Sequence, residues 1–554
     1  MSRSILTYLL KEAFQLTLNN EGVSGTYGSS TSGAAGATPE PVDSGTDALI
    51  PGSSNSISSR RTFLQRSMLG LVGAAAIPLT SGRLSAIQAG PSGRAVARPV
   101  ITIIGGGMAG LNYAYQLQKA GYKSTVYESS NRFGGRMFTV SGAFGEGLTT
   151  DFGGEWVDDE HFDIRALCQE FNIGLYDSRR KNLEKHTYFF EGRILDRQQI
   201  YDALLPYVAV LKRDTGRLPA EINKSNAAGL ADLDSLSITA YLDKIQLTGW
   251  LHRFLVVAME SEYGADAGDQ SAINLLIILR PPQSVKDMDD FEGQGAEVMK
   301  IKGGSQHLCQ AVYEKVKQQV YFGHELTAVS PHGKGFSVTL KAGNRLMQVK
   351  TDYLILTLPF SRLRKISLNV PLPAMKVRAI NELGYGNSAK LIMGFSTKPW
   401  AAIGHIGKLT SDLPFHTGWD SSLMQSDTRG TYTIFSGGKL SNKLKTTGPA
   451  ELAAEFLPEL DKVYPGMLPA YTGKSEKFIW ETYPHNLGAY SYYKVGQWTS
   501  IAGHEGEAAG QLRFAGEHCS QLWQGYMNGA ALSARLDAGS LISEIKRKFK
   551  VHNS

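Results

Sequence analysis

Three glycines and a carboxylate near residue 105 have the spacing that dinucleotide binding requires. The apolar run Val100–Ile104 predicts a buried parallel strand. Gly105 would make the tight turn after it, Gly107 would let backbone approach a pyrophosphate, and Gly110 would let the next helix pack closely. Glu128 stands where an acid binds ribose hydroxyls and would repel a 2′-phosphate, which disfavours an NADP-type ligand. The cofactor contacts predicted from this segment are Gly105, Gly107, Met108, Ala109, Gly110 and Glu128.

A second phosphate-binding signature lies near the end of the chain. The stretch Arg513–Glu517 leads to the glycine-rich stretch Gly525–Ala530, where a helix is predicted to start at about Met527. The positive end of that helix would point at a pyrophosphate. Two such segments at opposite ends of the chain indicate that the dinucleotide is FAD, held from both. The contacts predicted here are Gly516, Glu517 and Met527.

The elements that must position these residues are typical of an α/β fold. Leu111, Ala114 and Leu117 recur at helical spacing directly after the first motif. Ser124–Tyr127 and Tyr353–Leu358 predict two further buried strands. Strand, glycine motif, helix, strand and acid in this order predict a Rossmann-like nucleotide-binding domain.

The nucleotide-binding signals fall in three separated blocks, residues 97–180, 296–365 and 500–545. The two blocks between them, residues 181–295 and 366–499, hold helical patterns, loops and several tryptophans and tyrosines. We expect these two blocks to form an α+β substrate-binding domain inserted into the first domain. A ligand cleft would then form where the two domains meet.

The composition is that of an ordinary globular enzyme. Of 554 residues, 42% are hydrophobic and 19% are charged, and the net charge of +6 is too small to indicate nucleic-acid binding, although residues 546–554 form a basic tail. Cys168, Cys309 and Cys519 are too few and too scattered for a disulfide framework, and the histidines show no metal-binding spacing. We expect no metal, no nucleic-acid partner and no stable membrane span, and we leave open a homodimer.

Residues 1–96 have the features of a leader rather than of a folded domain. Residues 20–58 are rich in small and polar residues and cannot bury enough surface to fold. Arg60 and Arg61 precede the short apolar run Met68–Leu79, and this pair resembles a twin-arginine export signal, although it lies unusually deep in the chain. We expect an exported protein, periplasmic or secreted, with an uncleaved arm as the alternative.

The residues that follow Glu128 resemble those of the flavin amine oxidases, which include monoamine, polyamine and L-amino-acid oxidases. Arg132–Arg136 is similar to the family's second glycine-rich stretch, and Asp151–Val157 is similar to the segment against the flavin ring. Lys302–Gly304 and the strand around Leu326 resemble segments that border the flavin and contact its adenine end. The resemblance implies a FAD-binding domain of the glutathione-reductase type. The further cofactor contacts that it implies are Gly135, Arg136, Gly153, Gly154, Glu155, Leu326 and Glu517.

Three residues would carry the chemistry according to this resemblance. Lys390 resembles the lysine that holds a water near flavin N5. Tyr490 and Tyr526 resemble the two aromatic residues that flank the substrate amine, keep the site dry and guide the amine with their π faces. Ala489 stands where mammalian monoamine oxidases have the cysteine bonded to the flavin, so the resemblance implies noncovalent FAD.

The substrate class is less well specified by these motifs. Trp156 stands at about the place where many L-amino-acid oxidases have an arginine that clamps the substrate carboxylate, yet the segment Ile406–Pro414 does resemble the amino-acid oxidases. If Glu155 or Asp158 faces the cleft, it favours a second positive charge, as in a basic amino acid or a polyamine. The substrate contacts predicted are Trp156, Glu155, Trp419 and Gly525.

We expect oxidative deamination of an L-amino acid by hydride transfer to flavin N5, which gives an imine and then a keto acid, ammonia and hydrogen peroxide. Oxygen would be the electron acceptor. Oxidation of polyamines or primary monoamines is the alternative. The same fold serves desaturases and isomerases, and a flavoprotein kept as a binding scaffold is a further class. Peroxide production and bleaching of the flavin by a substrate would separate these classes.

Overall fold

The computed structural model describes residues 98–178, 186–280, 298–425 and 428–553. The expected leader, residues 1–96, lies outside these ranges. Among the described residues, no helix combines the length and the apolar composition that a membrane crossing requires. The same ranges contain no group of three or more His, Cys, Asp or Glu side chains placed to hold a metal ion.

A five-stranded parallel sheet forms the centre of the nucleotide-binding part, with the strand order β10-β2-β1-β14-β23. The buried strands predicted within residues 100–104, 124–127 and 353–358 are confirmed, because β1, β2 and β14 pair with one another in this sheet. Its strands are β1 (Ile101–Ile104), β2 (Thr125–Tyr127), β10 (Val320–Tyr321), β14 (Tyr353–Leu356) and β23 (Leu512–Phe514).

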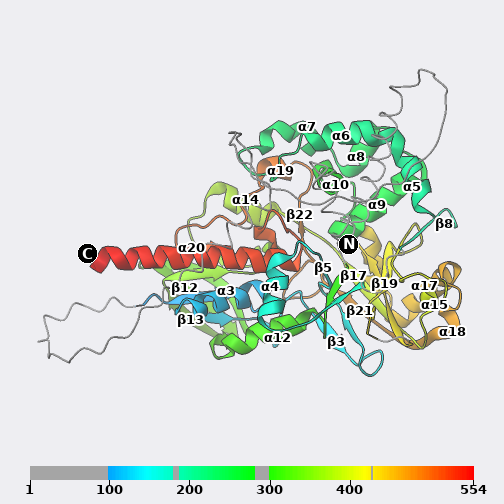
Figure 1. The fold of residues 1–554 in the computed structure, drawn as a ribbon. Helices are drawn as coiled ribbons and strands as arrows, with labels where there is room; N and C mark the ends of the chain where they lie inside the picture. Colours follow the sequence, from blue (N-terminus) through cyan, green and yellow to red (C-terminus); the bar gives the residue numbers. More distant parts are fainter. Residues whose placement is uncertain (1–97, 179–185, 281–297, 426–427, 554) are drawn as a thin grey trace, which may run out of the picture. The chain divides into compact units, whose positions relative to one another are not determined.

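Helix α3 (Met108–Lys119) follows β1 directly and packs against α12 (Ser305–Val316) and the long helix α20 (Met527–Asn553). Figure 1 shows α3 and α20 beside each other, although they come from opposite ends of the described chain. The predicted apolar face of α3 is buried in this contact. Helix α20 extends to Asn553, so residues 546–553 are part of a helix and not a separate tail.

The second part of the molecule is built on a seven-stranded sheet with the order β21-β17-β20-β19-β18-β7-β8. The strands β17 and β20 are buried along their whole length, and the amphipathic helix α17 (Pro449–Val463) packs on β17 and β21. The strands are β7 (Thr187–Phe190), β8 (Arg193–Leu195), β17 (Ala389–Phe395), β18 (Leu409–Ser411), β19 (Thr417–Asp420), β20 (Gly430–Ser436) and β21 (Tyr471–Ile479).

A group of helices between residues 197 and 279 packs beside this sheet, as Figure 1 shows. Helix α9 (Gly249–Tyr263) contacts β18 and β20 and ends at Gly264, whose φ of +65° is the left-handed conformation of a helix cap. Its position matters for the site described below. The other helices of the group are α5 (Arg197–Leu204), α6 (Val208–Gly216), α7 (Ala231–Asp234), α8 (Ile238–Lys244) and α10 (Ala272–Leu279).

Smaller elements complete the fold. Strand β9 (Met299–Ile301) lies between β5 (Trp156–Val157) and β6 (Leu175–Asp177), which places Trp156 opposite Lys300. An outer sheet has the order β13-β12-β11-β15. The remaining bounds are β3 (Thr139–Ser141), β4 (Thr149–Asp151), α4 (Phe162–Glu170), β11 (His324–His332), β12 (Gly335–Ala342), β13 (Arg345–Thr351), α13 (Phe360–Leu363), β15 (Ser367–Leu368), α14 (Ala374–Glu382), β16 (Gly384–Tyr385), α15 (Pro399–Ala402), α16 (Ser441–Thr446), α18 (Met467–Ala470), β22 (Ser491–Tyr492) and α19 (Gln497–Ser500).

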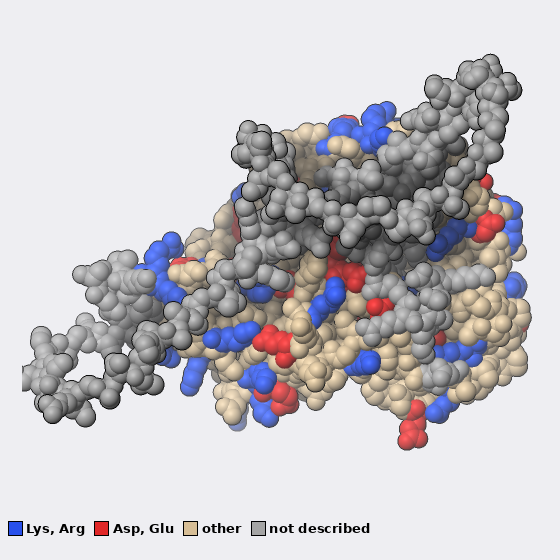
Figure 2. Space-filling model, viewed as in Figure 1, with Lys and Arg blue, Asp and Glu red and all other residues tan. Residues whose placement is uncertain are grey.

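Charged side chains of both signs are interspersed over the described surface in Figure 2. The cysteines behave as small apolar residues: Cys168 and Cys309 are buried, and Cys519 is half-buried. Burial raises the pKa of the Cys168 and Cys309 thiols to about 12, which keeps both in the unreactive thiol form.

Candidate active site

A cavity extends from the carboxyl ends of the parallel strands to the seven-stranded sheet, and segments far apart in sequence form its wall. Ligand sites in open α/β sheets lie in this position. The predicted residues on the wall are Gly105, Gly107, Met108, Ala109, Glu128, Gly135, Arg136, Gly153, Gly154, Glu155, Trp156, Lys390, Tyr490, Gly516, Glu517, Gly525, Tyr526 and Met527.

Three predicted residues do not line the cavity. A Cβ at Gly110 would lie 1.9 Å from the carbonyl oxygen of Gly105, so Gly110 serves the predicted close packing of helix on turn. Leu326 is buried on β11 within the hydrophobic core. Trp419 packs behind Phe435, which does line the wall, so direct substrate contact by Trp419 is not supported. Phe435 was not anticipated, because an apolar residue on a buried strand gives no signal of its own.

The nucleotide end of the cavity is organised around Glu128. Its Oε2 accepts the backbone N–H of Gly106 at 2.6 Å, and its Oε1 accepts that of Ser130 at 2.8 Å. A carboxylate has about four acceptor sites, so it can still receive ribose hydroxyls. Gly105, with a φ of +112°, makes the turn that brings the backbone to the carboxylate. This geometry fits the dinucleotide that the motif predicts.

The half-buried Arg136 and the buried Glu517 form an ion pair on the wall of the cavity. The Arg136 Nη1 donates to Glu517 Oε1 at 2.7 Å and to the Ala489 carbonyl at 2.8 Å. Glu517 also accepts both the N–H and the hydroxyl of Ser491 and the N–H of Gly525. Burial raises the pKa of Glu517, but the Arg136 guanidinium, His518 and the Ser491 hydrogen bond together more than offset this, so the pKa lies below its usual value. Because protein donors engage its carboxylate, Glu517 acts chiefly to join the two chain segments that carry the predicted aromatic pair.

The glycines opposite this ion pair permit close backbone approach. A Cβ at Gly153 would lie 1.9 Å from the Arg136 carbonyl oxygen, and one at Gly154 would lie 2.8 Å from the Met527 side chain. The small residues predicted to lie against a flavin are therefore required by packing. Trp480, which also lines the cavity, donates its indole N–H to the Phe152 carbonyl at 3.0 Å and was not identified from sequence. The cradle of glycines, the paired arginine and the ribose-binding acid together fit a flavin dinucleotide.

Lys390 extends from β17 into the cavity wall and is 5% exposed. Its Nζ donates to the carbonyls of Asp151 at 2.7 Å and Gly153 at 2.9 Å, and it contacts Glu155 Oε2 at 3.0 Å. An ammonium group has three N–H donors, and these contacts use all of them. A water held by Lys390, as predicted, would therefore have to share or replace one of these acceptors.

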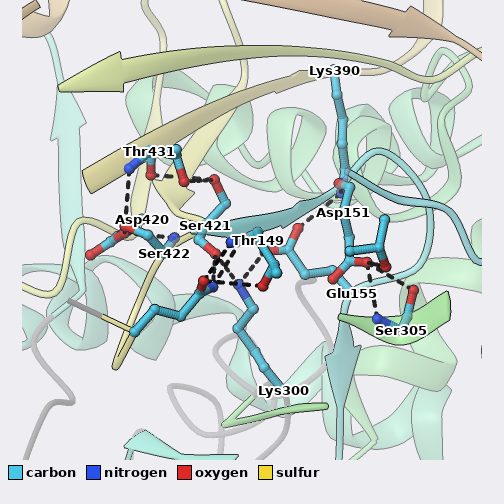
Figure 3. Close-up of polar contacts among 12 residues, drawn as sticks. Thr149, Asp151, Glu155, Lys300, Ser305, Lys390, Asp420, Ser421, Ser422 and Thr431 are labelled. Atoms are coloured by element: carbon cyan, nitrogen blue, oxygen red, sulfur yellow. Dashed lines mark hydrogen bonds and ion pairs between the residues drawn. The ribbon is translucent and has the colours of Figure 1, made fainter. Parts of the chain in front are cut away.

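Glu155 lies between two lysines. Figure 3 shows Lys390 and Lys300 reaching the Glu155 carboxylate from opposite sides, and the Lys300 Nζ lies 2.7 Å from Glu155 Oε1. Lys300 also donates to the Ser421 carbonyl. Burial raises the pKa of Glu155, but the ammonium groups of Lys300 and Lys390 more than offset this and lower it. Glu155 is thus already neutralised within the protein, which weakens its predicted role in recognising a second positive charge on the substrate.

The two predicted tyrosines are held by consecutive residues of α9. The Tyr490 hydroxyl donates to the Ser261 carbonyl at 3.1 Å, and the Tyr526 hydroxyl donates to Glu262 Oε1 at 2.6 Å. All four residues line the cavity. Glu262 was not identified from the sequence. A signal was present, because an acid in the last turn of a helix is disfavoured by the helix dipole and is therefore kept for another reason.

Asp158, the other acid considered from sequence, lies on the wall near these tyrosines. It faces His161 at 3.5 Å, and the His161 ring packs edge-on against the Tyr526 ring with centroids 5.3 Å apart. The end of the cavity next to Tyr526 therefore carries two carboxylates, those of Asp158 and Glu262. These two acidic side chains come from different segments of the chain, and no single sequence motif contains both.

The fold and this site define a class of protein. Residues 108–542 match the family model of the flavin containing amine oxidoreductases, and the chain belongs to that family. It is therefore a flavin-dependent oxidoreductase in which the mixed α/β architecture positions a flavin-binding part against a substrate-binding part.

Particular relatives cover most of the chain at low identity. A Mycobacterium tuberculosis protein named as a flavin-containing monoamine oxidase is 23% identical over 81% of this chain and 98% of its own length. The L-amino-acid oxidase of Pseudechis australis is 24% identical over 82% of this chain and 89% of its own. Among solved structures, cyclohexylamine oxidase from Brevibacterium oxydans has a TM-score of 0.70 at 19% identity, covering 81% and 100% of the two chains. Putrescine oxidase bound to putrescine has a TM-score of 0.69 at 18% identity, covering 81% and 99%.

Proposed function

We propose that the protein is an oxidase of primary amines that carry no carboxylate beside the amino group. The observation that carries this proposal is the pair of acidic side chains at the substrate end of the cavity. Asp158 and Glu262 lie there, beside the aromatic pair. An alkylammonium substrate is attracted by carboxylates and by the faces of aromatic rings, whereas a substrate carboxylate is repelled.

The basic groups on the described wall are committed elsewhere. Arg136 is paired with Glu517, and Lys390 is paired with Glu155. Arg132 donates to carbonyls of the second glycine-rich stretch, and His485 contacts Ser129 beside Glu128. A carboxylate entering with an amino acid would find none of these groups ready to form the bidentate pair that such recognition uses. This is why we prefer amines to the L-amino acids favoured by sequence alone.

An L-amino acid remains the second candidate because of one contact. The Lys408 Nζ lies 4.2 Å from the centre of the Trp156 ring, and Trp156 lines the cavity. Lys408 belongs to the segment 406–414 that resembles the amino-acid oxidases. If the Trp156 ring rotated away, the Lys408 ammonium group would be able to pair with a substrate carboxylate.

The residues of this chain would divide the work as follows. The flavin, when bound, would accept the hydride that leaves the substrate carbon. Tyr490 and Tyr526 would orient the amine and exclude water. Lys390, bonded to the Asp151 and Gly153 carbonyls, would hold this glycine-containing segment of the cavity wall in place. Oxygen would then accept the electrons and give hydrogen peroxide.

We further propose that the flavin is FAD, held without a covalent bond, in an exported protein. The support is the length of the cavity, which reaches from Gly105 and Glu128 to Tyr526, and the alanine at position 489, which has no sulfur to bond. Acid precipitation should release all the flavin into the supernatant, and yellow colour in the pellet would contradict the proposal. Export rests on the leader sequence alone and is tested by fractionating cells that express the full chain.

Matched substrate pairs test the choice between amines and amino acids. Peroxide production would be measured with tyramine against L-tyrosine, cadaverine against L-lysine, and putrescine against L-ornithine, with cyclohexylamine added. Each pair differs only in the carboxylate. We expect kcat/KM to favour the amine by on the order of 100-fold, because an unpaired buried carboxylate costs several kcal/mol. A preference for the amino acids would reverse the assignment, and Lys408→Met should then abolish that preference.

A further inference from the structure

Glu262 lies in the cavity beside Tyr526, where amine oxidation requires a group that can accept a proton. It sits at the end of α9, is 7% exposed, lines the cavity and receives the Tyr526 hydroxyl at 2.6 Å. Amine oxidation requires the nitrogen lone pair, yet an alkylammonium group has a pKa of about 10.4, so only about one molecule in 2,500 is neutral at pH 7. A site that binds the abundant ammonium form must therefore remove a proton.

We infer that Glu262 is the group that takes this proton from the bound ammonium substrate. The N–H bond breaks as an O–H bond forms on the Glu262 carboxylate, so one positive and one negative charge disappear together. The amine is left neutral beside Tyr526, with its lone pair available. This inference rests on the proposed function, since it concerns the same amine in the same cavity.

The backbone fixes the position of Glu262 firmly. A Cβ at Gly437 would lie 2.1 Å from the Glu260 carbonyl oxygen, and one at Gly386 would lie 2.3 Å from the Tyr263 carbonyl oxygen. The last turn of α9 thus packs directly against backbone on two sides. Because such contacts leave little room for movement, the carboxylate and both tyrosine hydroxyls keep a constant relation to each other.

Other titratable groups also lie near this end of the cavity. Asp158 faces His161, and Glu155 contacts Lys390. On α9 itself, Glu260 pairs at 3.1 Å with His416, which lies directly before β19. The phenols of Tyr263, Tyr490 and Tyr526 also line the wall. Glu262 is the carboxylate bonded to the aromatic pair, which makes it the acceptor best placed to meet an amine held there.

The test is the pH dependence of kcat/KM for whichever of tyramine, putrescine and cyclohexylamine the enzyme oxidises fastest. The wild type should show little dependence between pH 7 and the pKa of the amine. Glu262→Gln should use only the neutral amine, so its log kcat/KM should rise with unit slope up to that pKa. We expect a loss on the order of 1,000-fold at pH 7 and near-recovery at pH 10, because the neutral fraction of the amine rises by about that factor between these two pH values.

Two further variants separate proton acceptance from support of the aromatic pair. Tyr526→Phe removes the hydrogen bond to Glu262 but keeps the carboxylate, so it should keep the flat wild-type profile whatever its rate. Asp158→Asn should also keep it. Flavin content and melting temperature of each variant report on folding.

If Glu262→Gln does not fold, the pH profile of the wild type is still a test, because a unit slope in the wild type would overturn the inference. The same slope in wild type and Glu262→Gln would also overturn it while leaving the amine oxidase assignment intact. Failure to oxidise any of the three amines would instead overturn the proposed function and this inference together.

Discussion

Two regions of the molecule bury a lysine and a glutamate together, with opposite results. At the cavity, Glu155 contacts Lys300 and Lys390 through its carboxylate, and its pKa is lowered. Behind the nucleotide-binding sheet, Lys376 and Glu505 are also buried, but the Lys376 Nζ bonds to the backbone carbonyl of Glu505 and faces the Phe514 ring. Burial raises the pKa of Glu505 to about 7 and lowers that of Lys376 to about 8.

The difference shows that direct contact, and not proximity, decides whether buried charges survive. Where carboxylate and ammonium touch, their attraction exceeds the cost of removing water. Where they do not touch, desolvation dominates, and each group shifts toward its neutral form. The cavity cluster keeps its charges beside the proposed flavin site, whereas the interior cluster tends to lose them. Four variants test this contrast.

The largest effect is expected for Glu155→Gln. This change leaves two buried ammonium groups without the carboxylate between them, which should cost about 3–5 kcal/mol in the free energy of unfolding. Urea denaturation at pH 7 measures it. Lys300→Met is the matched control, because it leaves Glu155 paired with Lys390 and should cost less. Equal costs for the two variants would show that the cluster does not act through charge.

The second-largest effect is expected for Lys390→Met, which should change the rate of flavin reoxidation more than the stability of the protein. Removing the ammonium group frees the Asp151 and Gly153 carbonyls that it holds. We expect flavin reoxidation to slow by on the order of 100-fold while FAD remains bound. Stopped-flow mixing of reduced enzyme with oxygen measures this rate. Reoxidation at the wild-type rate would refute a role for Lys390 in oxygen chemistry.

Glu505→Gln should stabilise the protein in a pH-dependent way. The folded-state pKa of about 7 exceeds the ordinary 4.5, so the stability that the protonated group contributes is present below pH 4.5 and is lost as pH rises through 7. Glutamine stays neutral, so the gain should be near zero at pH 4.5 and at most on the order of 3 kcal/mol at pH 8. Thermal melts at the two values measure it, and an equal gain at both would contradict the argument.

Lys376→Met should also stabilise the protein, but with the smallest effect, because it also removes the Lys376 hydrogen bond to the Glu505 carbonyl. The folded-state pKa of about 8 lies below the ordinary 10.5, so the unfolded state binds more protons between these values and stability rises with pH there. Methionine should therefore raise the melting temperature at pH 7 and change it little at pH 10.5. A lower melting temperature at pH 7 would mean that Lys376 is stabilised by its contacts after all.

The residues that could be identified from sequence are mostly glycines that a tight backbone turn or a close backbone contact requires. Gly105, Gly110 and Gly153 were readable because a tight turn or close packing leaves glycine as the residue that fits. Trp419 and Leu326 were predicted as contacts by resemblance of their segments, but Trp419 packs against Phe435 and Leu326 packs in the hydrophobic core. For Trp419, spacing along the chain does not encode the direction of the side chain, because every residue of β19 is buried.

The sequence by itself determined the order of strand, glycine turn, helix and acid, because this local pattern fixes a nucleotide-binding unit within a short stretch of chain. The tertiary structure alone decided the charge of the substrate end. Glu262 reaches Tyr526 across 264 residues, and Lys300 reaches Glu155 across 145. Electrostatic contacts depend on distance in space, and folding brings together groups whose separation along the chain carries no information about it.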